Sequence, residues 1–208
     1  GYEGVRWPKM VGPDGRESPG GNALIVWNPP QPIHLSELLY RAAPGRATLE
    51  RYKELVQETA EALASMVHLD AAHGTYALGP PLWIAQEIYD PATSQDPCFE
   101  LAYWSWALAT AQRWRERSGR TRVAEWDDIL ARLAPLPVKD GLYVALGSDR
   151  SVHDLKGRPP ANSEQERLFM VQGLACVHGA FVSHVTGHLD FAQELRRLPE
   201  AAGLPLVL

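Results

Sequence analysis

Apolar residues recur at intervals of three and four positions from Thr48 to Leu69, and this spacing predicts a long amphipathic helix. Thr48 is the expected N-cap, and Gly74 is expected to follow the end of the helix. A helix with one apolar face must bury that face against another element. The segment therefore predicts a core built from packed helices.

Related patterns occur in other parts of the chain. They predict further helices at 33–42, from Asp96-Pro97 to Gly119 with Asp96 as N-cap, at 123–134 and within 163–198. The run 141–146 fits a short strand, but no strand-rich region and no repeat of fixed period is present. Helices joined by loops of mixed length indicate antiparallel helical hairpins, which build bundles, solenoids or α/α toroids. The absence of a repeat disfavours a solenoid, and the long loops favour an all-α toroid.

Residues 1–32 are rich in Gly and Pro and predict a long loop around the apolar run Ala23–Trp27. Loops of this length inside a compact domain are uncommon unless they are functional or disordered. The composition argues against disorder and suits the lining of a pocket. The side chains in question are Arg6, Trp7, Lys9, Glu17 and Trp27.

The composition is that of an ordinary globular chain, with 45% apolar and 22% charged residues among 208. A net charge of −5 disfavours nucleic acid as a partner, and no apolar run is long enough to span a bilayer. The seven Trp, seven Tyr and four Phe residues are large core residues or flat surfaces on which sugar rings stack. The sequence gives no expectation for the oligomeric state.

Cys98 and Cys176 cannot form a disulfide framework, and nothing indicates an oxidising compartment, so we expect a cytoplasmic location. The chain begins Gly1-Tyr2-Glu3 without an initiator Met or a leader, which is typical of the interior of a longer protein.

Metal binding is the rival chemistry. His184 and His188 are four residues apart and follow His178, but Gly187 weakens a helix there and no Glu follows His184. We expect no metal and no cofactor.

The segment Leu78–Glu87 carries the most suggestive carboxylate. A Gly-Pro-Pro turn is followed by Leu82-Trp83-Ile84-Ala85-Gln86-Glu87. Apolar neighbours raise the pKa of a glutamate, and a carboxylic acid that stays protonated near neutrality can protonate a departing glycosidic oxygen. Glu87 is therefore a candidate general acid, while a solvent-facing or helix-starting glutamate is the simpler interpretation of the pattern alone.

A set of motifs follows in a definite order along the chain. The motifs are Gly4-Val5-Arg6-Trp7-Pro8-Lys9, Gly15-Arg16-Glu17, Trp27 to Arg41 with Glu37-Leu38-Leu39-Tyr40-Arg41, Tyr52–Ala60, Leu78-Gly79-Pro80-Pro81 to Gln86-Glu87, Pro97–Trp104 and Trp114-Arg115-Glu116-Arg117. In their order and spacing they resemble the six-hairpin glycosidases, and more loosely the maltose and kojibiose phosphorylases and the inverting α-L-fucosidases. The resemblance covers roughly residues 1–145.

The resemblance implies a partial (α/α) six-hairpin toroid that cleaves a glycosidic bond with inversion, with Glu87 as general acid. An inverting enzyme holds a second carboxylate roughly 6.5–9.5 Å from the acid. Glu17 and Glu37 are the candidates within this chain, whereas the family places the base in a later part of the barrel or uses phosphate instead. The residues expected to hold an oligosaccharide or glycoside are Arg6, Trp7, Lys9, Trp27, Gln31, Glu37, Trp83, Gln86, Phe99, Glu100 and Trp104.

The chain departs from the family pattern at two places. Pro30-Gln31-Pro32 has Gln where the family has His, and the resemblance ends near His153. We therefore expect residues 1–145 to be the first part of a catalytic domain, in a barrel that is truncated, and 146–208 to be a helical tail of uncertain origin. The alternative is an incomplete, non-catalytic helical protein that binds carbohydrate or has a structural role.

Overall fold

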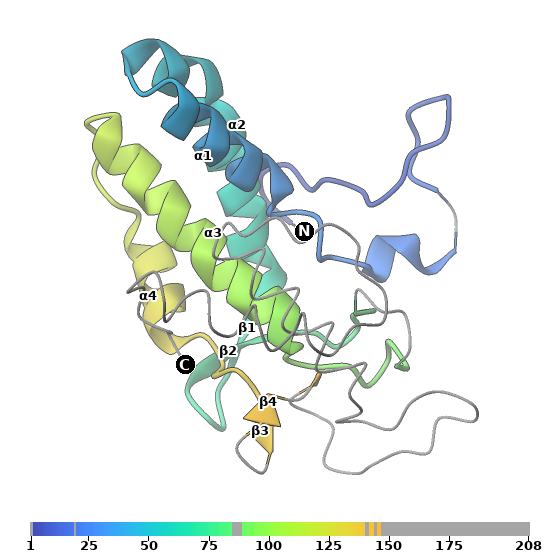
Figure 1. The fold of residues 1–208 in the computed structure, drawn as a ribbon. Coiled ribbons are helices and arrows are strands. Elements are labelled where there is room, and N and C mark those ends of the chain that lie inside the picture. The colour runs from blue at the N-terminus through green and yellow to red at the C-terminus, as the bar shows by residue number, and fades with distance from the viewer. Residues whose placement is uncertain (1, 19, 85–88, 140–141, 144, 147–208) are drawn as a thin grey trace, which may run out of the picture.

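The computed structural model describes residues 2–18, 20–84, 89–139, 142–143 and 145–146. Its described helices are α1 (Gln31–Ala42), α2 (Arg46–Met66), α3 (Cys98–Arg117) and α4 (Ala124–Arg132), with a short 3-10 helix η1 (Gly21–Leu24) before α1. The strands β1 (Val67–Asp70) and β2 (Thr75–Leu78) pair antiparallel, as do β3 (Val138–Lys139) and β4 (Leu142–Tyr143). The helices α1, α2 and α3 lie side by side, and α4 packs beside α3 (Figure 1).

The helices follow the predicted patterns closely. The directions of α2 and α3 are opposite, because Trp104 contacts Leu63 while Arg115 contacts Gln57. Between these helices lies the hydrophobic core, in which the side chains of Leu63, Leu101 and Trp104 are fully buried. Burying a side chain of this kind stabilises the fold by roughly 1.5–3 kcal/mol. The predicted helical core is therefore confirmed for α1 to α4.

The expectation of an all-α chain folded as a partial toroid is wrong, because the described residues contain two antiparallel strand pairs. The helix predicted to continue to Leu69 ends at Met66, and Val67 begins β1. Asp70 closes the turn to β2, since its carbonyl accepts from the backbone N–H of His73 (3.2 Å) and of Gly74 (2.8 Å). Gly74 adopts φ +70°, a conformation that glycine reaches at little cost. Gly74 therefore belongs to a hairpin turn and not to a helix end.

Two predicted helix caps are also wrong. Thr48 lies inside the first turn of α2, and its hydroxyl donates to the carbonyl of Ala43 at 2.7 Å. The N-cap of α3 is Pro97, whereas Asp96 accepts a hydrogen bond from the backbone N–H of Leu78 at 2.8 Å. The stop at Gly119 is confirmed, since Gly119 follows the C-cap of α3 with φ +71°.

The loop between β2 and α3 is held at both ends. Asp96 N–H donates to the Leu78 carbonyl at 2.8 Å, and Leu82 N–H donates to the Pro91 carbonyl at 3.0 Å. Gly79 fits this closure because a Cβ there would lie 2.6 Å from the Ser94 carbonyl oxygen. The loop is thereby fixed against the end of the bundle where α3 begins.

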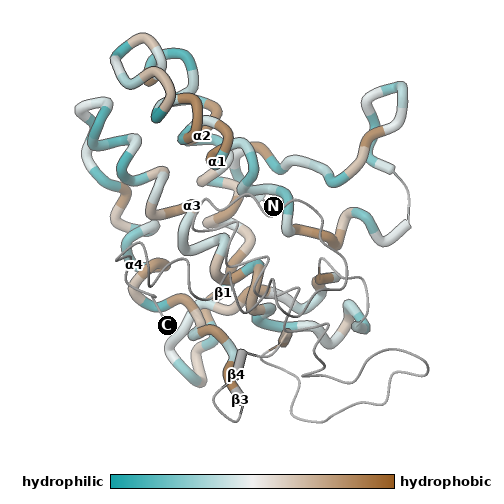
Figure 2. The backbone as a smooth tube through the Cα atoms, viewed as in Figure 1, coloured by the Kyte–Doolittle hydropathy of each residue, from teal (hydrophilic) through white to brown (hydrophobic). Residues whose placement is uncertain are grey.

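The chain that precedes α1 lies against the same bundle. Residues 2–18, which we call the N-terminal arm, leave the bundle and return toward η1 (Figure 1). The short apolar segment after η1 is brown in Figure 2 and includes the buried residues Ile25 and Val26. These two residues anchor the connection between the arm and α1.

Candidate functional site

The N-terminal arm is tied to α2 by backbone hydrogen bonds. Val5 N–H donates to the Glu58 carbonyl at 2.9 Å, and Glu3 N–H donates to the Ser65 hydroxyl at 3.1 Å. Gly4 permits this approach, because a Cβ at that position would lie 2.2 Å from the Glu58 carbonyl oxygen. The arm is therefore positioned by contact with a helix and can present its side chains in a defined geometry.

Arg6 and Glu17 form an ion pair within the arm. The hairpin-like path of the arm brings them together, with Val11 and Glu17 in an antiparallel bridge. Their side chains are 24% and 25% exposed. Arg6 Nη1 and Glu17 Oε1 are buried and have no hydrogen-bond partner in the structure described for this chain. One donor and one acceptor thus remain beside the ion pair.

Trp7 and Asn28 extend this polar group. The Trp7 indole N–H donates to the Thr59 hydroxyl at 2.9 Å, and Asn28 Nδ2 donates to the Trp7 carbonyl at 2.7 Å. Asn28 Oδ1 is buried without a partner among the described residues. The sequence offered one signal for Asn28, since Asn before Pro29-Pro30 is typical of a turn, but no signal for a binding role.

Trp83 lies on the loop after β2 and contacts η1. Its backbone N–H donates to the Leu24 carbonyl at 2.8 Å, and its ring packs on Gly21, where a Cβ would lie 2.5 Å from Trp83 Cζ3. The indole Nε1 is buried and unpartnered within the described part of the chain. We use the name aromatic–polar site for Arg6, Trp7, Glu17, Asn28 and Trp83. The ion pair and the Asn28–Trp7 hydrogen bond join the first four residues, and Trp83 contacts η1.

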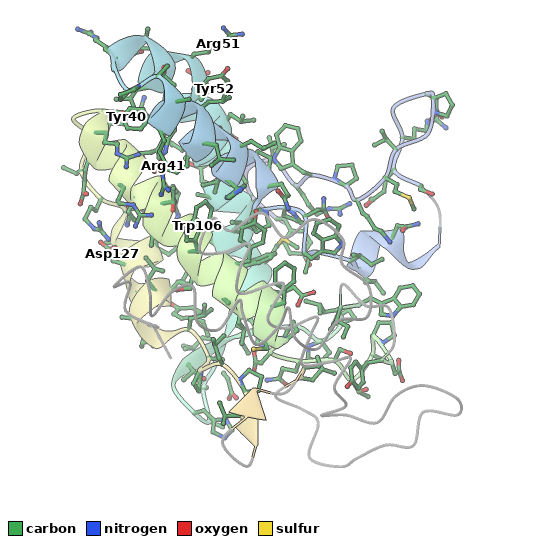
Figure 3. The ribbon with its side chains drawn as sticks, viewed as in Figure 1. Tyr40, Arg41, Arg51, Tyr52, Trp106 and Asp127 are labelled. Atoms are coloured by element: carbon green, nitrogen blue, oxygen red, sulfur yellow. The ribbon has the colours of Figure 1, made fainter. Side chains whose placement is uncertain are left out.

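His34 is a further residue with an unpartnered polar atom, and the sequence did not indicate it. It lies on α1 and packs against two rings of α3, Trp106 at 5.3 Å and Tyr103 at 6.5 Å between centroids. Figure 3 shows Trp106 on α3. Burial and the charge of Arg41 lower the pKa of His34, while Glu37 opposes them. His34 Nδ1 is buried and has no partner among the residues described, so a neutral imidazole is held with one free nitrogen.

The other predicted site residues occupy different positions. Phe99 packs on Tyr103 at the start of α3, with 5.8 Å between ring centroids, and Glu100 is buried one position later. Trp104 is a core residue, because it is fully buried and its indole donates to the Leu63 carbonyl at 3.0 Å. The half-buried residues Lys9, Trp27 and Gln31 lie on the arm, before α1 and at the first position of α1. Gln86 and Glu87 lie outside the described residues.

Glu37 is separated from the aromatic–polar site and is fully engaged in packing. Its carboxylate accepts from Trp114 Nε1 at 2.8 Å, from Arg117 Nη1 at 2.6 Å and from Arg41 Nε at 3.0 Å. Figure 3 shows Arg41 beside α3. Burial raises the pKa of Glu37, but these hydrogen bonds outweigh it and lower the pKa overall. Glu37 thereby joins α1 to the C-terminal half of α3.

No group of His, Cys, Asp or Glu residues within the described ranges could hold a metal ion. The three histidines considered above, at 178, 184 and 188, lie outside those ranges. In the described part of the chain, no helix combines the length and the apolar character that crossing a membrane requires. Neither a known protein-family model nor a curated protein matches this sequence.

The aromatic–polar site combines unpartnered hydrogen-bond donors with unpartnered acceptors. Buried polar groups in folded proteins nearly always have a partner, and a buried group without one costs about 1–3 kcal/mol. Here two donors, on Arg6 and Trp83, and two acceptors, on Glu17 and Asn28, are buried without a hydrogen-bond partner among the described residues. A hydroxyl both donates and accepts, so a polyol satisfies both kinds of group at once.

Proposed function

We propose that this chain holds a carbohydrate at the aromatic–polar site and belongs to an enzyme that cleaves glycosidic bonds, with Glu87 as general acid. The observation that carries the proposal is the set of unpartnered donors and acceptors beside tryptophan rings. Indole rings offer flat apolar faces to the C–H faces of sugars, and the polar atoms match sugar hydroxyls. The resemblance of residues 1–145 to glycosidases supports the same substrate class.

Cleavage requires a proton donor and, for an inverting reaction, a carboxylate that activates water on the opposite face of the sugar. Glu87 lies outside the described residues, and its support as the donor is the resemblance to the glycosidases and the apolar residues that precede it in the sequence. For the second carboxylate we propose Glu17, because one of its oxygens has no partner among the described residues. Both oxygens of Glu37 already accept hydrogen bonds, which disfavours Glu37 in this role.

Binding and turnover are tested separately. Titration of the 208-residue chain with gluco-, manno- and galacto-configured oligosaccharides, followed by tryptophan fluorescence, is expected to give saturable binding. Trp83→Phe keeps a ring but removes the unpartnered N–H, so we expect a Kd roughly tenfold higher, as for loss of one hydrogen bond to a buried partner. Glu54→Gln, an exposed position on α2, is the matched control. Absence of saturable binding by all three sugar series would refute the proposal.

Turnover is measured on aryl glycosides with Glu87→Gln. We expect hydrolysis to be abolished while the Kd for the sugar stays within about twofold, because the amide keeps the shape of the carboxyl but cannot donate its proton. Unchanged hydrolysis in Glu87→Gln would exclude Glu87 as the acid. Saturable sugar binding without hydrolysis in the unmodified chain would identify a carbohydrate-binding protein instead of an enzyme.

A further inference from the structure

A basic hollow lies between α2 and the C-terminal end of α3, and none of the residues that line it belongs to the aromatic–polar site. It is open to solvent and is lined by Lys53 and Gln57 of α2, Trp114 and Arg115 of α3, and Ser118 and Arg120 beyond α3. Trp114 lies 14 positions after Glu100 in α3, a separation of about 20 Å along the helix axis. The hollow and the start of α3 are thus at opposite ends of the bundle.

Two guanidinium groups converge on one neutral oxygen in this hollow. Arg115 Nη1 and Arg120 Nη1 donate to Gln57 Oε1 at 3.1 and 2.7 Å. The orientation of the amide is set on its other side, where Gln57 Nε2 donates to Glu61 Oε1 at 2.9 Å. Neither arginine forms an ion pair with any residue that the structure describes. Two positive charges are therefore held close together around a group that neutralises neither of them.

The local backbone fixes both arginines. Ser118 N–H, Gly119 N–H and Arg120 N–H donate to carbonyls in the last turn of α3, at 3.0, 3.0 and 2.8 Å. These bonds occupy the carbonyls that give a helix C-terminus its partial negative charge. Arg115 is further held by its Nε, which donates to the Thr121 carbonyl at 2.7 Å. The turn thus presents arginine side chains where a bare helix end would repel an anion.

Other groups of the hollow suit an anion as well. Ser118 Oγ is buried and has no hydrogen-bond partner in the described part of the chain. Lys53 adds a third positive charge, and Glu50 forms an ion pair with Lys53 and also attracts Arg120 electrostatically. Each guanidinium has five N–H donors, and among the described residues the side chain of Arg120 donates through only one of its nitrogens. The overall charge of −5 makes general attraction of anions unfavourable, so binding must come from these local groups.

We propose that this hollow binds a phosphate group, with Arg115, Arg120 and Lys53 supplying the charge and Ser118 a hydroxyl donor. Paired guanidinium groups match phosphate oxygens through parallel charge-assisted hydrogen bonds, and a hydroxyl adds a neutral donor. The proposal does not depend on sugar binding at the aromatic–polar site.

The test is isothermal titration calorimetry of the full chain at low ionic strength, with inorganic phosphate in one series and glycerol 3-phosphate in a second. We expect saturable one-site binding. Arg120→Gln should raise the Kd about tenfold, since it removes a charge-assisted hydrogen bond, and Ser118→Ala should raise it severalfold. Arg120 is exposed, so its replacement leaves the core intact, and circular dichroism verifies the fold of each variant. Tighter binding of the ester supports a phosphorylated ligand, and tighter binding of the free ion supports phosphate itself.

The matched control is Arg51→Gln, which removes an exposed positive charge of α2 outside the hollow and should leave the Kd within twofold. Three results would overturn the proposal: no saturable binding of either compound, an equal loss of affinity in Arg51→Gln, or unchanged affinity in both Arg120→Gln and Ser118→Ala. Phosphate binding is measured without sugar and should be unaffected by Trp83→Phe. Failure here is therefore distinguishable from failure of the proposed glycosidase function.

Discussion

Replacement of the buried glutamate of α1 offers the sharpest test of how the helices are held together. Glu37→Gln keeps the shape of the side chain but replaces one acceptor oxygen by an NH₂ group. Donors approach both oxygens in the native fold, from Trp114 and Arg117 on Oε2 and from Arg41 and Arg117 on Oε1. Either orientation of the amide therefore places its NH₂ group against another donor.

The magnitude follows from these contacts. A hydrogen bond to a charged group contributes about 1.5–3 kcal/mol. Arg41 is 61% exposed and regains water readily, so its bond adds little, whereas Arg117 is 28% exposed and Trp114 is buried. We expect the free energy of unfolding to fall by about 2 kcal/mol at pH 7. For a chain of 208 residues this corresponds to a melting temperature lower by about 4–8 °C.

The pH dependence separates charge from packing. The pKa of Glu37 in the folded chain is lower than its ordinary value of 4.5, because the hydrogen bonds from Arg117, Trp114 and Arg41 outweigh the opposing effect of burial. A lowered pKa contributes stability that is present above about pH 4.5 and lost as the pH falls through the folded value. The stability difference between the native chain and Glu37→Gln should therefore be largest near neutrality and shrink in acid.

Urea unfolding followed by tryptophan fluorescence, repeated from pH 7 to pH 3, measures this difference. Glu54→Gln, on the exposed side of α2, is the control and should stay within about 0.5 kcal/mol of the native chain at every pH. A difference for Glu37→Gln that does not vary with pH would refute the assignment of the stabilisation to charge. A difference no larger than that of the control would refute the structural role altogether.

Three further outcomes are expected from the described residues. Burial raises the pKa of the Cys98 thiol to about 12, so iodoacetamide at pH 8 should leave Cys98 unmodified in the folded chain, as peptide mass spectrometry can show; rapid alkylation would contradict this. Burial, aided by the charge of Arg41, lowers the pKa of His34, so NMR should show its imidazole titrating below 6.5. The stability that the neutral imidazole contributes should then be lost as the pH falls below that value, and a titration midpoint at or above 6.5 would exclude the arrangement. Gly4→Ala places a Cβ 2.2 Å from the Glu58 carbonyl oxygen at φ +65° and should release the arm from α2. Trypsin should then cleave within residues 2–18 faster than in the native chain, and equal cleavage rates of the two proteins would count against the contact.

The helices were predictable because their signal is local. A residue pattern with intervals of three and four reports the apolar face of a helix, and the core residues Val56 and Leu63 of α2 follow from it. The helix ends were less predictable, because tertiary contacts decide them. Asp96 reads as an N-cap beside Pro97, yet its carboxylate bonds Leu78, which is 18 residues away. Such a contact leaves no mark on the neighbouring sequence.

The β1–β2 pair was missed for a related reason, whereas β4 lies within the short strand predicted at 141–146. Val67 and Leu69 continue the apolar spacing of α2, so periodicity alone extends the helix through them. Pairing with residues across the Asp70–Gly74 turn outweighs that local preference, as β1 and β2 form a complete antiparallel register. A helical spacing that ends in Val, Leu and an Asp–Gly turn is equally compatible with a hairpin, and only the partner strand distinguishes the two.

The candidate site was predictable in part. Arg6, Trp7 and Glu17 were singled out from the loop composition and the resemblance, and the arm brings Arg6 and Glu17 into contact. Asn28 and His34 were missed, because nothing in their neighbours distinguishes a turn-forming Asn or a half-buried His from a residue with a free polar atom. Whether a polar group has a partner is a property of the folded chain.

The contrast between Glu37 and Glu17 shows how the two kinds of buried charge differ in this molecule. Glu37 has donors on both oxygens, from elements distant in the sequence, so folding itself satisfies it and its replacement should affect stability. One oxygen of Glu17 binds Arg6, and the other has no partner among the described residues, so no hydrogen bond offsets the desolvation free energy of that second oxygen. A ligand that donates a hydrogen bond to Glu17 offsets this desolvation on binding. Without a ligand, the free energy of unfolding should therefore change more on replacement of Glu37 than on replacement of Glu17.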